Sequence, residues 1–174
     1  MFSAFLCYNV AQGANMKTAV VYYTLDGNCA IVAREIKNKL GAEVIRLQTQ
    51  DEKKRSMIGK MFWGGGMVFS GKKPPLKPYT FDPSAYELIV IGAPVWAGSP
   101  APPILTFLSE AAITGKKIAL FVCHGGGKGK SLEKFKAWLA GNDIVAEADF
   151  INPARGNSDE VGQQIADWVK GFST

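Results

Sequence analysis

Residues 20–30 read Val20-Val21-Tyr22-Tyr23-Thr24-Leu25-Asp26-Gly27-Asn28-Cys29-Ala30. The apolar, β-branched start of this stretch predicts a buried strand, and the polar residues 24–28 predict a short loop that leads into a helix. The first amides of a helix have no partner within it, and they lie at the positive end of the helix dipole. A loop of this composition between a strand and a helix is therefore a candidate site for a phosphate group.

The rest of the chain alternates between strand and helix patterns. Apolar β-branched runs predict strands, and apolar positions at helical spacing predict helices. The predicted strands are residues 18–23, 42–47, 88–91, 117–123 and 144–150, and the predicted helices are 28–40, 102–112, 131–140 and 158–172, with a further candidate at 54–63. This alternation predicts an α/β fold in which a five-stranded parallel sheet carries helices on both faces.

The composition is that of an ordinary globular protein. The chain has 174 residues, of which 47% are hydrophobic and 20% are charged, and these values suit one folded domain. No apolar run is long enough to cross a bilayer, so we expect no membrane span. The formal charge of +5 favours acidic partners or phosphorylated ligands. We predict no nucleic-acid binding, because no basic helix with interleaved aromatic residues is present.

The cysteines and the N-terminal residues indicate the redox state of the thiols and the bounds of the domain. Cys7, Cys29 and Cys123 are odd in number and unrelated in spacing, which favours reduced thiols in a cytoplasmic protein over a disulfide framework or a metal site. Residues 1–15 carry no charge and are expected to be an extension outside the core, with a weak secretory signal as the alternative. Residues 16–174 then form a single domain, in which the irregular stretch 50–83 is an insertion without a predicted role.

The loop Thr24-Leu25-Asp26-Gly27-Asn28-Cys29 resembles the phosphate-binding loop of flavodoxins and their relatives, usually a Ser/Thr-rich turn that ends in Thr-Gly-Asn-Thr. Two positions depart from that pattern: Asp26 replaces a hydroxyl residue, and Cys29 replaces a threonine. A carboxylate that faces a phosphate dianion costs energy, so we expect Asp26 to point outward and shape the turn while backbone amides bind the ligand. The alternative is a helix start without a ligand, capped by Asn28.

This resemblance covers nearly the whole chain from Lys17 onward. It implies a flavodoxin-like three-layer sandwich with strand order 2-1-3-4-5. In such open sheets the ligand lies outside the carboxyl ends of the strands, where the winding direction switches, and flavodoxin with its FMN is itself one of the examples behind this rule. For this order the switch falls between the first and third strands, so the crevice lies between the loops that follow residues 23 and 91.

The loop after the third strand contains Pro94-Val95-Trp96-Ala97-Gly98. In flavodoxin-like proteins the equivalent loop cradles the isoalloxazine ring of FMN, and this segment resembles that loop. Trp96 would offer an aromatic face to the ring, while Gly92 and Gly98 would let the backbone approach it closely. The alternative is a tryptophan packed in the core beside a turn stiffened by proline.

The loop after the fourth strand begins Cys123-His124-Gly125-Gly126. By resemblance it would close over the other side of the ring, with glycine amides donating to flavin oxygens. Cys123 and His124 are not expected to form a catalytic pair, because neighbours on a strand point to opposite faces. Residues 125–131 approach the pattern of a nucleoside-triphosphate loop, but its first glycine would fall on His124, so we predict no ATPase. We predict no catalytic side chain and no metal site.

The resemblance implies a redox protein that carries electrons through non-covalently bound FMN. Its partner would be a protein, such as a reductase or a ferredoxin-like protein. The alternative is an NAD(P)H-dependent reductase of quinones, nitro compounds or flavin. The basic charge favours this alternative, because electron-carrying flavodoxins are commonly acidic. Lys72, Lys73 and Lys77 would attract a nicotinamide phosphate or an acidic ferredoxin, and the alternative for this run is a solvated, flexible loop. A regulatory or storage module that binds FMN is a third possibility.

Overall fold

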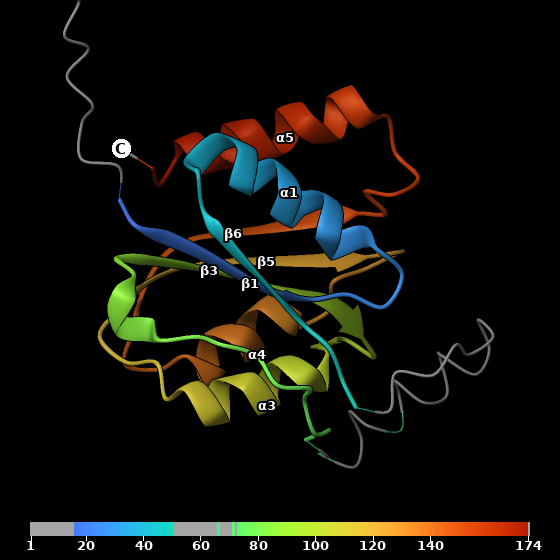
Figure 1. Ribbon diagram of the computed structural model, residues 1–174. Helices are drawn as coiled ribbons and strands as arrows, with labels where there is room; N and C mark the ends of the chain where they lie inside the picture. The colour runs from blue at the N-terminus through green and yellow to red at the C-terminus, as the bar shows by residue number, and fades with distance from the viewer. Residues whose placement is uncertain (1–15, 51–65, 67–70, 72, 174) are drawn as a thin grey trace, which may run out of the picture.

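The computed structural model describes residues 16–50, 66, 71 and 73–173 (Figure 1). The predicted extension 1–15 with Cys7, the candidate helix 54–63 and Lys72 lie outside the described residues. In chain order the elements are β1 (Thr18–Tyr23), α1 (Asn28–Leu40), β2 (Glu43–Leu47), the 3-10 helix η1 (Pro83–Ala85), β3 (Leu88–Trp96), β4 (Ser99–Pro100), α3 (Pro102–Ala111), β5 (Lys117–His124), α4 (Ser131–Trp138), β6 (Asp143–Ile151) and α5 (Ser158–Lys170).

The main strands form a parallel sheet in the order β2-β1-β3-β5-β6, and the short strand β4 pairs only with the end of β3. Numbered without β4, this is the predicted order 2-1-3-4-5, which is confirmed. The order places β1 and β3 side by side, with Val21 opposite Ile91 in the register. The winding direction therefore switches between these two strands, and the segments that follow them begin at the same edge of the sheet.

Helices cover both faces of the sheet, as Figure 1 shows: α1 and α5 lie on one face, and α3 and α4 lie on the other. The strands alternate between the two layers because successive side chains of a strand point to opposite faces. Val21 and Tyr23 pack in the cluster on the α3 and α4 side, whereas Val20 and Tyr22 pack in the cluster on the α1 and α5 side. Burial on both faces explains the unbroken apolar run of β1.

The helix ends follow local sequence signals. Gly41 ends α1 with a left-handed φ of 63°, and its N–H donates to the carbonyl of Lys37. α3 begins at Pro102, where the missing N–H of proline costs no helical hydrogen bond. It ends at Ala111, one residue before the predicted end, because Ala112 has a left-handed φ of 45°.

β3 is longer than the sequence predicts. The prediction ended this strand at Ile91, but its pairing with β5 continues to Pro94, which lies opposite Cys123. Beyond that point β3 folds back on β4, with Val95 opposite Pro100. Proline breaks a strand pattern in the sequence because it has no N–H, yet it is tolerated near the end of a strand. The tertiary pairing with β5 thus extends β3 into the expected loop.

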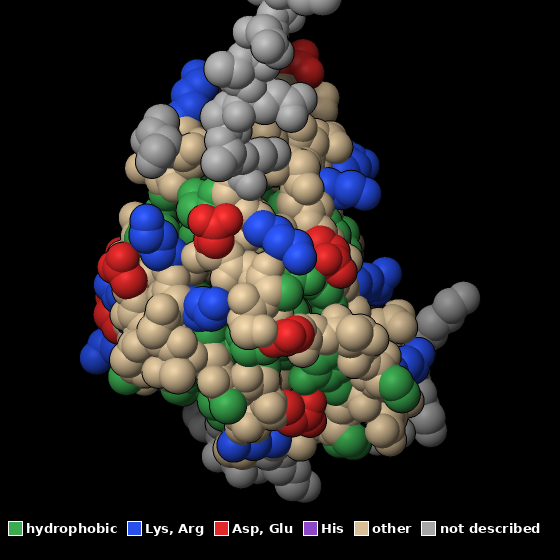
Figure 2. Space-filling view, turned by 60° about the vertical axis from the view of Figure 1, so that its left-hand side comes forward, with side chains coloured by type: hydrophobic (Ala, Val, Ile, Leu, Met, Phe, Trp, Pro, Cys, Tyr) green, Lys and Arg blue, Asp and Glu red, His purple; other side chains and the backbone are tan. Residues whose placement is uncertain are grey.

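Charges of both signs are spread over the end of the molecule at which β1 and β3 begin. Figure 2 shows Lys, Arg, Asp and Glu side chains interspersed on this face. Mixed charge of this kind is typical of a solvated surface. Among the described residues, no helix is both long enough and apolar enough to span a membrane.

Candidate functional site

The loop between β1 and α1 is held by its own backbone and side chains. Thr24, buried at the end of β1, accepts a hydrogen bond at Oγ1 from the N–H of Gly27 at 3.0 Å. Gly27 is the N-cap residue of α1 and has a φ of 91°, a conformation that a side chain disfavours. A Cβ built on Gly27 would meet no atom within 4 Å, so the backbone here borders open space.

Asp26 is exposed, and its Oδ1 accepts a hydrogen bond from the N–H of Asn28 at 3.3 Å. This bond closes a turn over two residues, which is the shaping role expected of Asp26. It also engages one amide that an anion would otherwise use. Asn28 does not cap the helix, since the N-cap is Gly27 and it makes no side-chain cap bond. The Asn28 Oδ1 instead accepts from the N–H of Ala154 at 2.9 Å, which ties the loop to the segment after β6.

Several amides of this segment are available. Within the described part of the chain, the N–H groups of Leu25, Asp26 and Cys29 have no hydrogen-bond partner. The Cys29 amide lies in the first turn of α1, where the helix dipole favours negative charge. These amides meet the requirement for an anion-binding loop.

The second predicted segment forms a tight hairpin. Pro94, Val95 and Trp96 are the last residues of β3, and Trp96 lies opposite Ser99 of β4. The two residues between them, Ala97 and Gly98, have φ values of 46° and 67°. Positive φ at both positions is typical of the two-residue turns that suit the twist of paired strands. The predicted loop is therefore a rigid turn that fixes the position of Trp96.

Gly92 does not serve the close approach to a ligand that we expected of it. It is buried in β3, and a Cβ added there would lie 2.0 Å from Cζ of Phe121. The absence of a side chain at Gly92 makes room for the Phe121 ring, which lies on the neighbouring strand β5. Gly98 fits the expectation better, because a Cβ there would meet open space.

The two loops come together through an aromatic contact. The ring of Tyr23, the last residue of β1, meets the ring of Trp96 edge-on, with centroids 5.7 Å apart and planes at 88°. Trp96 is half-buried and packs against the core on the α3 and α4 side. The alternative of a core tryptophan therefore holds for the part of Trp96 that packs against this cluster, and the side chain as a whole is half-buried. The structure brings residues 24–29 and 94–98 to one edge of the sheet.

The third predicted segment is divided between core and surface. Cys123 has only 2% of its surface exposed and lies under α1, whereas Gly125 and Gly126 are exposed. The loop that follows lies against the hairpin, because a Cβ on Gly129 would be 3.0 Å from the Cα of Gly98. In this segment only Gly125 and Gly126 face solvent, and they lie in the loop beside the hairpin.

His124 is turned into the protein. Its side chain is 6% exposed, and its Nε2 lies 3.0 Å from Oδ2 of Asp149 on β6. The other oxygen of Asp149 accepts a hydrogen bond from Lys128. Hydrogen bonds from Lys128 and then from His124 hold the pKa of Asp149 below its usual range. This cluster joins β5, the glycine-rich loop and β6, which is a structural role.

Sequence reasoning missed Tyr23 and Asp149 as parts of this region. Tyr23 had a usable signal, since it is the aromatic residue directly before the polar loop. Asp149 had none, because its partner His124 is 25 residues away and only the pairing of β5 with β6 brings them together.

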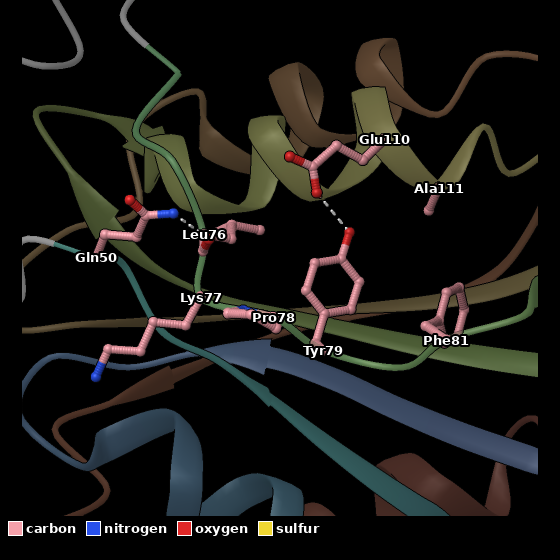
Figure 3. Close-up of a pocket in the computed structure, with 8 residues that line it drawn as sticks. All are labelled: Gln50, Leu76, Lys77, Pro78, Tyr79, Phe81, Glu110 and Ala111. Atoms are coloured by element: carbon pink, nitrogen blue, oxygen red, sulfur yellow. Dashed lines mark hydrogen bonds between the residues drawn. The ribbon is translucent and has the colours of Figure 1, made fainter.

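A separate pocket of about 430 Å³ lies between α3 and residues 76–81 (Figure 3). Figure 3 shows Tyr79 and Glu110 pointing toward each other across it, and the Tyr79 hydroxyl donates to Glu110 Oε2 at 2.7 Å. Burial, followed by this hydrogen bond, raises the pKa of Tyr79. Lys77 lines the pocket, but none of the predicted site residues does. The pocket is therefore distinct from the crevice between β1 and β3.

Comparison with known proteins identifies the fold. No protein-family model and no curated protein matches the sequence. Solved structures do match: a flavoprotein from Lactobacillus acidophilus in complex with FMN has a TM-score of 0.71 and 22% identity over 88% of this chain and 98% of that chain. The chain has the flavodoxin-like fold.

Two further structures support this fold. A protein from Bacteroides eggerthii, classed provisionally as a flavoprotein, has a TM-score of 0.76 and 18% identity over 91% of this chain and 99% of that chain. The two-electron reduced flavodoxin of Megasphaera elsdenii has a TM-score of 0.51 and 18% identity, covering 86% of this chain and 98% of that chain.

Proposed function

We propose that this chain is a redox protein that binds FMN non-covalently and carries electrons for a partner protein. The contact between Tyr23 and Trp96 carries the proposal, because it sets an amide-lined loop and a half-buried indole side by side at the switch point of the sheet. Solved neighbours of the same fold include a flavoprotein in complex with FMN.

The residues of the chain suit the parts of FMN. The free amides of Leu25, Asp26 and Cys29 would hold the phosphate at the start of α1. Trp96, fixed by its hairpin, would lie against the ring and keep water from one side of it. The exposed backbone of Gly125 and Gly126 would donate hydrogen bonds at the far side of the ring.

The protein's part is to bind, orient and shield the cofactor. Bound FMN supplies one-electron and two-electron transfer, so the proposal assigns no catalytic role to a side chain of this chain. The buried position of His124 against Asp149 agrees with that division, because its Nε2 is engaged within the protein. Electrons would pass at the exposed edge formed by the hairpin and the glycine-rich loop, where a redox protein can dock.

One observation favours a second candidate, an NAD(P)H-dependent FMN reductase of quinones or nitro compounds. The chain has a formal charge of +5, and Lys130 is exposed in the loop that lies against the Trp96 hairpin. An exposed lysine in this loop would attract the phosphates of a nicotinamide nucleotide.

The first experiment tests the cofactor. Purified protein should show the visible spectrum of oxidised flavin and release FMN on denaturation. Trp96→Ala should weaken FMN binding and shift its reduction potentials without unfolding the domain. Trp138→Ala is the matched control, because Trp138 is also half-buried against the same core cluster but lies on α4. A protein that takes up no FMN in excess, or equal losses in the two variants, would contradict the proposed site.

The second experiment separates the two functions. NADPH and a quinone are mixed with the FMN-loaded protein in the absence of any partner. The electron-carrier proposal expects no steady oxidation of NADPH until a flavodoxin reductase is added. Steady turnover by the protein alone would instead establish the reductase, and Lys130→Gln should then raise its KM for NADPH.

A further inference from the structure

The segment between β6 and α5 contacts both the proposed phosphate loop and the glycine-rich loop after β5. The N–H of Ala154 donates to Oδ1 of Asn28, the first residue of α1, at 2.9 Å. The N–H of Asn152 donates at 2.9 Å to the carbonyl of His124, the last residue of β5. In Figure 1 this segment lies beside the loop that leads from β1 into α1. We call residues 152–156 the bridging turn, because they join the two loops.

The bridging turn has a fixed backbone. Asn152 has a left-handed φ of 42°, which asparagine tolerates better than most residues. Its carbonyl accepts hydrogen bonds from the N–H groups of Arg155 at 2.8 Å and Gly156 at 3.2 Å. Its side-chain amide also donates to the carbonyl of Gly125 at 3.4 Å. These bonds hold the backbone of Arg155 next to the start of α1.

The side chain of Arg155 is available to a ligand. It is exposed, and within the described part of the chain its guanidinium makes no ion pair and no hydrogen bond. The nearest acidic residues along the chain, Asp159 and Glu160, lie in the first turn of α5, where the dipole of that helix stabilises their charges. A guanidinium can donate two parallel hydrogen bonds to a phosphate. Arg155 therefore has the charge and the donors that suit a phosphate at the start of α1.

We propose that Arg155 binds the phosphate of FMN and that the bridging turn is a wall of the phosphate site. This inference rests on the proposed FMN function. The loop 24–29 contains no lysine or arginine, and its one charged residue, Asp26, repels a phosphate dianion. Arg155 supplies the missing positive charge from the far end of the chain, since Ala154 and Asn28 are 126 residues apart.

The charge of Arg155 acts on selectivity and on the protonation of the ligand. Riboflavin has no phosphate, so Arg155 favours FMN over riboflavin. A free phosphomonoester loses its second proton at about pH 6. A neighbouring cation stabilises the dianion, so the bound phosphate should lose this proton at a lower pH beside Arg155 than without it.

The first test compares the binding of FMN and riboflavin. Both flavins are titrated into the FMN-free protein and its variants, and quenching of flavin fluorescence gives the affinity. Arg155→Gln should weaken FMN binding by about tenfold and leave riboflavin binding unchanged. Arg155→Lys should recover part of the loss, because lysine keeps the charge but not the planar fork.

The matched control is Lys134→Gln, which removes one positive charge from an exposed position on α4, on the opposite face of the sheet. It should leave FMN affinity unchanged. Unchanged FMN affinity in Arg155→Gln, or an equal loss in Lys134→Gln, would overturn the role of Arg155 while the proposed function stands. A parent protein that binds neither flavin would overturn the proposed function and this inference together.

The second test follows the phosphate itself by phosphorus NMR of bound FMN over a pH series. The bound phosphate should titrate at a lower pH in the parent than in Arg155→Gln. A general loss of packing would not produce this difference. Identical titration curves in the two proteins would overturn the contact between Arg155 and the phosphate.

The third test examines how the bridging turn positions Arg155. Asn28→Ala removes the oxygen that accepts the hydrogen bond from Ala154. The loss of FMN affinity caused by Arg155→Gln should therefore be smaller in the Asn28→Ala background than in the parent. Equal losses in the two backgrounds would show that the bond to Asn28 does not position Arg155.

Discussion

Asp26 places a carboxylate among amides that suit an anion. It is exposed and accepts a hydrogen bond from Asn28 at 3.3 Å, so it shapes the turn at the cost of a negative charge near the proposed phosphate. Two unit charges about 4 Å apart in water repel by about 1 kcal/mol, and a phosphate dianion carries more than one charge. The charge of Asp26 therefore opposes FMN binding, while its oxygen helps to hold the loop.

Replacing Asp26 with Asn should separate these two effects. The amide keeps an oxygen that can accept from Asn28 and removes the charge, so we expect FMN to bind about fivefold more tightly, or about 1 kcal/mol. Quenching of flavin fluorescence at low ionic strength measures the affinity, and the gain should shrink with salt. Asp143→Asn, which changes the net charge equally at the start of β6, is the control. A gain in FMN affinity that does not depend on salt concentration would contradict repulsion between Asp26 and the phosphate. An equal gain in Asp143→Asn would contradict it as well.

At the scale of elements, β3 packs beside β5 because Gly92 has no side chain and leaves room for the ring of Phe121. Gly92→Ala would bring a methyl group to 2.0 Å from the ring of Phe121, so we expect a loss of about 1–3 kcal/mol in the free energy of unfolding. Urea denaturation of the FMN-free protein measures the loss. Adding Phe121→Leu should recover part of it, since the two residues are in direct contact.

Gly162→Ala is the control for Gly92→Ala. Gly162 lies inside α5, and a Cβ added there would have no atom within 4 Å. Gly162→Ala should stabilise the protein by about 0.5–1 kcal/mol, because alanine favours a helix more than glycine does. If both alanine variants changed stability in the same direction, the explanation by contact with Phe121 would be wrong.

The pairing of β5 with β6 predicts a pH dependence. Hydrogen bonds from Lys128 and then His124 lower the pKa of Asp149, so this carboxylate stabilises the fold above its unfolded pKa of about 3.9 and loses that effect as the pH falls through its lower folded pKa. Asp149→Asn should cost about 1 kcal/mol at pH 7. In urea unfolding over a pH series, the difference from the parent should disappear at strongly acid pH. A constant difference would indicate a packing defect instead.

For the whole molecule, binding FMN should stabilise the native state, because the ligand binds only the folded chain. At an FMN concentration about 100 times Kd the gain is about 2.7 kcal/mol, which corresponds to a rise of about 5–10 °C in Tm for a chain of this size. Riboflavin has the ring without the phosphate and is the matched control. Its smaller shift at equal concentration would measure the contribution of the loop 24–29.

Equal shifts with FMN and riboflavin would show that the amides of Leu25, Asp26 and Cys29 do not hold a phosphate. Absence of any shift would contradict flavin binding by the folded chain.

Much of the architecture could be predicted from the sequence, because each element carries its own pattern. β1 and α1 begin and end at the residues that the pattern indicates, since an apolar run and a helical repeat are local properties of the chain. The strand order came from the resemblance to flavodoxins and is confirmed. The end of β3 was misplaced, because the partners of Gly92 and Pro94 lie on β5, far along the chain.

The candidate site was also predicted only in part. The sequence by itself determined which segments are polar, glycine-rich and placed after strands, and hence which of them are candidates to bind FMN. Only the tertiary structure decided that Tyr23 meets Trp96 and that His124 turns to Asp149. The physical reason is that backbone preferences act between near neighbours, whereas these contacts depend on how strands far apart in the chain pair and which face of the sheet each side chain enters.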